Sequence, residues 1–84
     1  MSIRKVSIGQ VKAARALLSW SQDELADASG VSLPTIKRLE ASSGPLGGRA
    51  ATAQLLVGAL EAAGVIFIDE NGEGPGVRLR KGRD

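Results

Sequence analysis

The sequence contains no histidine and no cysteine among its 84 residues. The missing histidine excludes Ser-His-Asp triads, histidine general bases and histidine-bound metals, and the missing cysteine excludes disulfides and thiolate metal sites. The carboxylates fall on expected exposed helix faces or in a glycine-rich turn, not in an inward-facing pair. We therefore expect no enzyme, no bound metal and no cofactor.

Aromatic residues are also scarce, with one Phe, one Trp and no Tyr. The hydrophobic content of 43% must then supply a core of Ala, Leu, Val and Ile, which is thin for so short a chain and would gain from a dimer interface. Trp20 is expected to anchor this core between two helices, and the alternative is a ligand or DNA contact.

Long apolar runs are absent, and the start of the chain lacks the pattern of a signal peptide. We expect one small cytoplasmic domain with no membrane contact.

The net charge of +2 is small, but the charges are segregated along the chain. Basic residues without acids occupy positions 1–20, more follow at 78–83, and acids gather at 23–27 and 69–73. Either this separation builds one basic face suited to nucleic acid, or the surface is an ordinary mixed one.

Residues 21–40 predict two short helices joined by a tight turn. Ser21 and Glu24 fit a capping box, in which each side chain bonds the backbone of the other residue. Gly30 ends the first helix, because glycine takes the left-handed conformation without Cβ strain. Ser32 is then a second N-cap, and Pro34 falls in the first turn of the next helix.

The helix over about residues 32–41 is the expected recognition helix. Helical spacing turns Ile36 and Leu39 toward the core. The residues left outside are Leu33, Thr35, Lys37 and Arg38. A short helix with small and basic residues on its outer face suits a DNA major groove.

Two further helices complete the predicted bundle. The first runs over residues 8–18 after a Ser7–Gln10 capping box, and the last runs over about residues 49–63 and ends at Gly64. Apolar stripes are expected at Val11, Ala14, Leu17 and Leu18 in the first, and at Leu55, Leu56, Ala59, Leu60 and Ala63 in the last.

A change of hydrophobic period from 3.6 to 2 predicts a β-hairpin at the C-terminal end. Its strands are residues 65–68 and 76–80, and Asn71-Gly72 lies in the turn. An isolated hairpin is barely stable, so it should dock on the helices and pair with the hairpin of a second chain. The expected dimerisation residues are Val65, Ile66, Phe67, Ile68, Val77 and Leu79. The alternative is a hairpin folded only onto its own helices.

Residues 10–40, and more loosely those up to 63, resemble the Xre/Cro/C1-type helix-turn-helix family of phage repressors and bacterial regulators. The likeness is carried by RALLSWSQDELA at 15–26 and SGVSLPTIKRLE at 29–40, in the family's order and spacing. The resemblance implies a lambda-repressor-like domain that binds double-stranded DNA. A hairpin replaces the fifth helix that many relatives carry, so dimer geometry does not transfer.

The resemblance also implies roles for individual residues. Gln22 would bond a DNA phosphate or base edge, and Gly30 would form the turn. Arg15 and Glu40 would form a structural salt bridge, with a phosphate contact as a second role for Arg15. The whole DNA-binding set is Arg15, Gln22, Ser32, Leu33, Pro34, Thr35, Lys37, Arg38 and Arg49.

Base readout would come from the outer face of the recognition helix. Leu33 would pack on a thymine methyl, and Lys37 or Arg38 would reach a guanine edge or, alternatively, only phosphates. Arg4 and Lys5 form either a minor-groove arm or a frayed terminus.

The sequence thus predicts a mainly α fold of four helices and a C-terminal β-hairpin. Residues 1–64 form the helix-turn-helix part, and residues 65–84 complete the same domain and dimerise. The predicted function is a sequence-specific transcriptional regulator that binds an inverted-repeat operator as a homodimer. The alternative is an antitoxin or antiactivator module whose hairpin captures another protein by β-augmentation.

Overall fold

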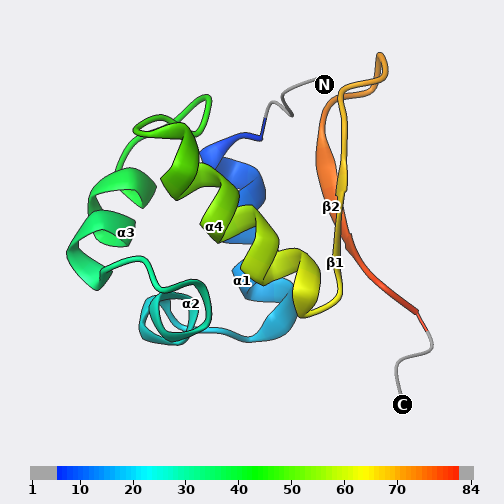
Figure 1. The fold of residues 1–84 in the computed structure, drawn as a ribbon. Helices are drawn as coiled ribbons and strands as arrows, with labels where there is room; N and C mark the ends of the chain where they lie inside the picture. The colour runs from blue at the N-terminus through cyan, green and yellow to red at the C-terminus, as the bar shows by residue number, and fades with distance from the viewer. Residues whose placement is uncertain (1–5, 82–84) are drawn as a thin grey trace.

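The computed structural model describes residues 6–81 of the chain, with four helices and one two-stranded antiparallel hairpin in that part (Figure 1). The elements in chain order are α1 (Ile8–Leu18), α2 (Gln22–Ser29), α3 (Leu33–Glu40), α4 (Ala50–Ala62), β1 (Val65–Ile68) and β2 (Gly76–Leu79). The predicted fold class is therefore confirmed. The hairpin stands beside α1 and α4, on the far side of the bundle from α3 (Figure 1).

Serine N-caps determine where three of the helices begin. Ser7 with Gln10 and Ser21 with Glu24 both form complete capping boxes, which satisfy backbone N–H groups at the starts of α1 and α2. Ser32 caps α3 by accepting from the N–H of Thr35. The start of α4 has no side-chain cap, since Arg49 occupies its N-cap position.

The core is aliphatic, as the shortage of aromatic residues requires. Its fully buried large side chains are Val11, Leu25, Ile36, Leu56, Leu60 and Val65. Phe67 is also buried, and Trp20 is partly buried against this cluster, in the anchoring place expected for it.

Two leucines of the predicted apolar stripes are instead exposed. Leu17 is 43% exposed and Leu55 is 52% exposed. Successive helical residues point about 100° apart, so only one of two adjacent leucines can face a narrow core. Leu18 and Leu56 take those places.

The hairpin docks through the side chains that alternate toward the helices. Val65 lies opposite Leu79 and Phe67 opposite Val77. Val65 and Phe67 are 1% and 8% exposed. These two expected dimerisation residues therefore fill the core of their own chain, and a second chain cannot pack on them. Ile66, Ile68 and Val77 stay partly exposed, and Leu79 is 42% exposed.

Gln10 joins the helices to the hairpin, which its capping role alone does not predict. Its Nε2 donates to the carbonyl oxygens of Ile68 (3.2 Å) and Gly76 (2.9 Å), the last facing pair of the hairpin. Its Oε1 accepts from the N–H of Ser7 at 2.9 Å. The amide is buried, so its polar groups have lost their hydrogen bonds to water on folding. The three bonds within the protein replace them.

Candidate nucleic-acid interface

The turn between α2 and α3 is fixed by a left-handed glycine. Gly30 has a φ of 78°, and its N–H donates to the carbonyl oxygen of Ala26 at 2.9 Å. Val31 follows and is buried in the core, and its N–H donates to the Ser29 hydroxyl at 3.1 Å. The turn thus sets the direction in which α3 leaves the core.

Replacing Gly30 with alanine should destabilise the fold by about 1 kcal/mol, because an L side chain is strained in this backbone conformation. Gly58 is the matched control: it lies in α4, with nothing within 4 Å of an added Cβ. Gly58→Ala should stabilise the fold by about 0.5–1 kcal/mol. Urea unfolding of both variants measures the contrast, and equal destabilisation would contradict the assigned role of the turn.

Helix α3 has one buried and one exposed face. Ile36 and Leu39 are 1% and 9% exposed and pack in the core. Pro34, Lys37 and Arg38 are exposed, while Leu33 and Thr35 are partly exposed. The hydroxyl of Ser32 donates to Oγ1 of Thr35 at 2.9 Å, which orders the start of the helix.

An ion pair ties α1 to the end of α3. Arg15 Nε donates to Glu40 Oε2 at 2.8 Å and Arg15 Nη2 to Glu40 Oε1 at 2.6 Å. Arg15 Nη1 also donates to the carbonyl oxygen of Trp20 at 2.9 Å. The Glu40 side chain is 5% exposed and that of Arg15 is 19% exposed, so the pair is partly shielded from water.

Gln22 joins the same network from the start of α2. Its Nε2 donates to Glu40 Oε1 at 3.0 Å. A carboxylate only accepts hydrogen bonds, so this contact orients the amide with its nitrogen toward Glu40. The second Nε2 hydrogen and the amide oxygen are left for other partners. Arg15 and Gln22 therefore have a structural role, since they join α1 and α2 to the end of α3 through Glu40.

The surroundings hold both partners in their charged forms. Burial raises the pKa of Glu40, but the bonds from Arg15 and Gln22 and the charges of Arg15 and Lys12 outweigh it, so the pKa lies below the ordinary value. The bond to Glu40 raises the pKa of Arg15 despite its partial burial.

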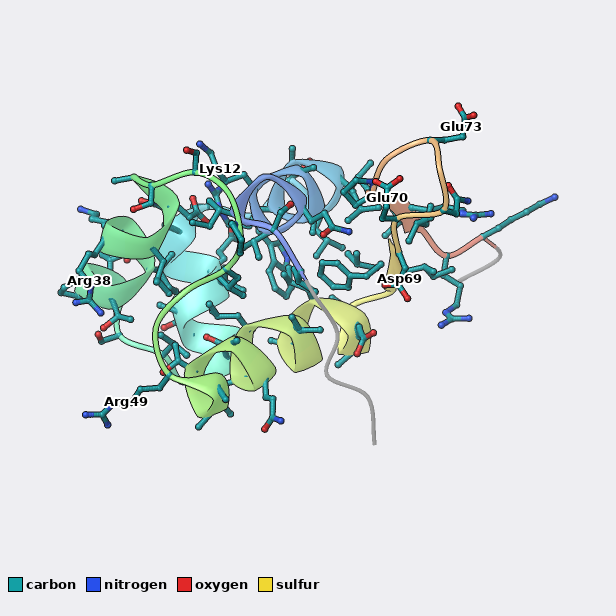
Figure 2. The ribbon with its side chains drawn as sticks, turned by 90° about the horizontal axis from the view of Figure 1, so that it is seen from above. Lys12, Arg38, Arg49, Asp69, Glu70 and Glu73 are labelled. Atoms are coloured by element: carbon teal, nitrogen blue, oxygen red, sulfur yellow. The ribbon has the colours of Figure 1, made fainter. Side chains whose placement is uncertain are left out.

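Two sets of charges lie at opposite ends of the molecule, although α2 also carries acids and the end of the hairpin also carries cations. Lys12, Arg38 and Arg49 lie on the side of the molecule that carries α3 (Figure 2). The acids Asp69, Glu70 and Glu73 lie at the other end, around the hairpin turn (Figure 2). Lys12 was not among the predicted contacts, although its charge and its place off the apolar stripe are visible in the sequence. Its Nζ reaches the carbonyl oxygen of Glu40 at 3.5 Å, at the end of α3.

The capped helix α2, the turn at Gly30 and the half-exposed helix α3 all lie in a part of the chain that matches a known protein family. The helix-turn-helix family model HTH_3 matches residues 11–61. The chain belongs to this Xre/Cro/C1-like helix-turn-helix family. No curated protein sequence gives a significant match.

Membership in HTH_3 makes the chain a DNA-binding transcription regulator, and the family's domain is typically non-enzymatic. The matched region runs from α1 through most of α4 and leaves the hairpin outside. None of the helices in residues 6–81 combines the length and the hydropathy of a membrane-spanning segment.

The predicted contact residues of this HTH_3 domain occupy three places. Most follow the start and outer face of α3: Ser32, Leu33, Pro34, Thr35, Lys37 and Arg38. Arg15 of α1 and Gln22 of α2 both bond Glu40 and so lie near the end of α3. Arg49 is exposed at the N-cap position of α4. The Arg4–Lys5 arm falls outside the described residues.

Proposed function

We propose that this HTH_3 protein is a sequence-specific regulator that binds an inverted-repeat operator as a homodimer, with α3 in the major groove. The observation that carries the proposal is the exposed face of α3. It holds two adjacent cations, Lys37 and Arg38, and no acidic side chain between Leu33 and Arg38. Such a face can approach DNA without a charge penalty.

The roles divide between base edges and backbone. Arg38 or Lys37 would bond guanine O6 and N7, and Leu33 would pack on a thymine methyl. Thr35 and the ordered start of α3, with Ser32 and Pro34, would lie against the phosphates or the first base edge. Gln22, Arg49 and the partly exposed Arg15 would contact phosphates on either side, which positions the helix without reading sequence.

A two-fold dimer would place its recognition helices on one side of the DNA. Half-site centres are then a whole number of DNA turns apart, about 34 Å for a single turn. Regulation would follow from occlusion of the promoter by the bound dimer or from its direct contact with polymerase.

Replacing Arg38 with alanine should weaken operator binding by about 1–3 kcal/mol and relax the preference at one base pair of each half-site. The measurement is fluorescence anisotropy on an operator found by selection from random duplexes, with each base pair varied in turn. The control is Asp27→Ala, an exposed change on the outer side of α2. Unchanged affinity on every operator variant would remove Arg38 from base readout, and the lack of any selected sequence would contradict the proposed function.

A further inference from the structure

The backbone of strand β2 has hydrogen-bonding groups with no partner in the described chain. The N–H of Arg80 donates to the carbonyl oxygen of Gly64 at 2.7 Å, so the backbone groups of Arg80 point toward β1. Residues with this orientation alternate along an antiparallel ladder, so Arg78 and Gly76 also direct their backbone groups toward β1. The groups of Val77 and Leu79 must point the other way. Within residues 6–81, no backbone bond from outside the hairpin reaches them.

The side chains along this edge are apolar toward the helices and charged at the two ends. Val77 is partly buried on the core, and Leu79 is 42% exposed on the same side of the sheet. The acidic turn, with Glu73 at its exposed tip, precedes β2 (Figure 2). Arg80 and Lys81 follow β2 and are exposed. The strand thus runs from a negative end to a positive end.

We propose that β2 pairs antiparallel with β2 of a second copy, so that two hairpins form one four-stranded sheet. The proposal names the interface of the homodimer. It rests on the proposed function in one respect, that the protein is a homodimer. Antiparallel pairing about a two-fold axis places the negative end of each strand beside the positive end of the other. A second copy is therefore complementary in charge as well as in backbone hydrogen bonding.

Charge also selects the register of the two strands. If Val77 pairs with Leu79 of the partner subunit, Arg78 faces Arg78 of the partner subunit. If Leu79 pairs with its own copy, Arg78 faces Arg80 of the partner subunit. Like charges directly opposite destabilise a sheet, so both registers are disfavoured.

Pairing Val77 with Val77 of the partner subunit avoids this repulsion. Arg78 then faces a glycine, Gly76 of the partner subunit. Leu79 lies beside Pro75 of the partner subunit, whose missing N–H is tolerated at a strand end. Lys81 and Glu73 of the partner subunit, in the bends just outside the paired strands, then come to the same end of the interface, and the symmetry gives this attraction twice.

The other edge of the hairpin suits a second copy less well. Pairing of β1 with its own copy offers no such charge complement, because Asp69 follows β1 while residues 62–64 before it carry no charge. Beside β1 there is also an open hollow of about 460 Å³, lined by Glu61, Val65, Ile66, Phe67, Asp69 and Arg80. A strand added there would stand over unfilled space.

A charge exchange tests the register. In the full chain, Glu73→Lys and Lys81→Glu should each weaken dimerisation about 10-fold at low salt, because each reversal replaces attraction by repulsion at two symmetric sites. The double variant should recover the dimer. Asp27→Lys, which changes the net charge as Glu73→Lys does, is the control and should leave the dimer intact. Sedimentation equilibrium measures the dissociation constants.

A proline tests the edge itself. Leu79→Pro removes an N–H that points away from β1, so the hairpin keeps its own bonds while the dimer loses one at each end. The variant should be a folded monomer by circular dichroism and sedimentation. A monomeric wild type, or a dimer indifferent to both the proline and the charge changes, would overturn the proposal. A dimer of another interface that binds an operator would leave the proposed function standing, and a monomeric wild type would overturn both the interface and the homodimer of that function. A dimer of the stated register that binds no operator would contradict the function alone.

Discussion

Glu40→Ala is expected to destabilise the fold by about 3 kcal/mol, a large share of the stability of a domain this small. The carboxylate accepts from Arg15, through two nitrogens, and from Gln22. Its loss leaves a guanidinium and an amide without their acceptor in a site shielded from water. The expected value lies at the low end for buried pairs, because Arg15 is 19% exposed and can regain some hydration. Urea denaturation measures the loss.

A double-mutant cycle separates the ion pair from simple packing. The cycle compares Arg15→Met, Glu40→Leu and the double variant, which removes both charges and should be more stable than Glu40→Leu alone, since no unpaired charge stays behind. Asp27→Ala, on an exposed surface, should change stability by less than about 0.5 kcal/mol. Additive effects of the two single changes would mean that Arg15 and Glu40 do not stabilise each other.

The same pair gives a defined pH dependence. The pKa of Glu40 in the folded chain lies below its ordinary value of 4.5. Its ionised form therefore stabilises the fold above that value, and this contribution is lost as the pH falls through the folded-state pKa. The stability difference between the wild type and Glu40→Gln should shrink below about pH 4.5. A difference that stays constant down to pH 2 would contradict the ion-pair assignment.

The second large effect is expected in DNA binding. Operator affinity should fall by about 10³–10⁴-fold between 50 and 200 mM salt, if a dimer neutralises six to eight phosphates. Lys12, Lys37, Arg38 and Arg49 give four exposed cations per chain on the side of α3, enough for that number. Anisotropy titrations across this salt range give the slope directly.

A single-residue change calibrates that slope. Arg49→Ala removes one proposed phosphate contact per protomer and should lower the slope by about 2 for the dimer, with the preference among operators unchanged. Lys81→Ala, just after β2 in the hairpin that stands on the far side of the bundle from α3 (Figure 1), should leave the slope unchanged at protein concentrations that keep the dimer assembled. A salt-independent affinity would rule out the phosphate contacts altogether.

Much of this fold follows from local signals in the sequence. The capping boxes at Ser7 and Ser21, the glycine at position 30 and the change of period at residue 65 each act over a few residues, and the helices and strands lie within about one residue of their predicted places. The half-buried α3 follows from helical spacing in the same way, and Arg15 and Glu40 lie where the family resemblance puts them.

The features that were missed depend on contacts distant in sequence. Gln10 lies 58 residues from Ile68, and nothing near it indicates that its amide bonds the hairpin. The orientation of Gln22 depends on Glu40, which arrives from another helix. The inward faces of Val65 and Phe67 could be read as a dimer surface, because alternation shows which side chains share a face but not what covers that face.

The three hydrogen bonds of the Gln10 amide also indicate which segments must stay together when this domain is transferred into another protein. The family region ends at residue 61, before the hairpin begins. Cutting there would strip the carbonyl acceptors from the Gln10 amide and uncover the side of α1 and α4 on which Val65 and Phe67 pack. A chimaera that keeps α1 must therefore inherit the hairpin with it. If α3 reads the operator as proposed, by contrast, grafting its exposed Lys37 and Arg38 should be enough to change the operator preference without disturbing the core.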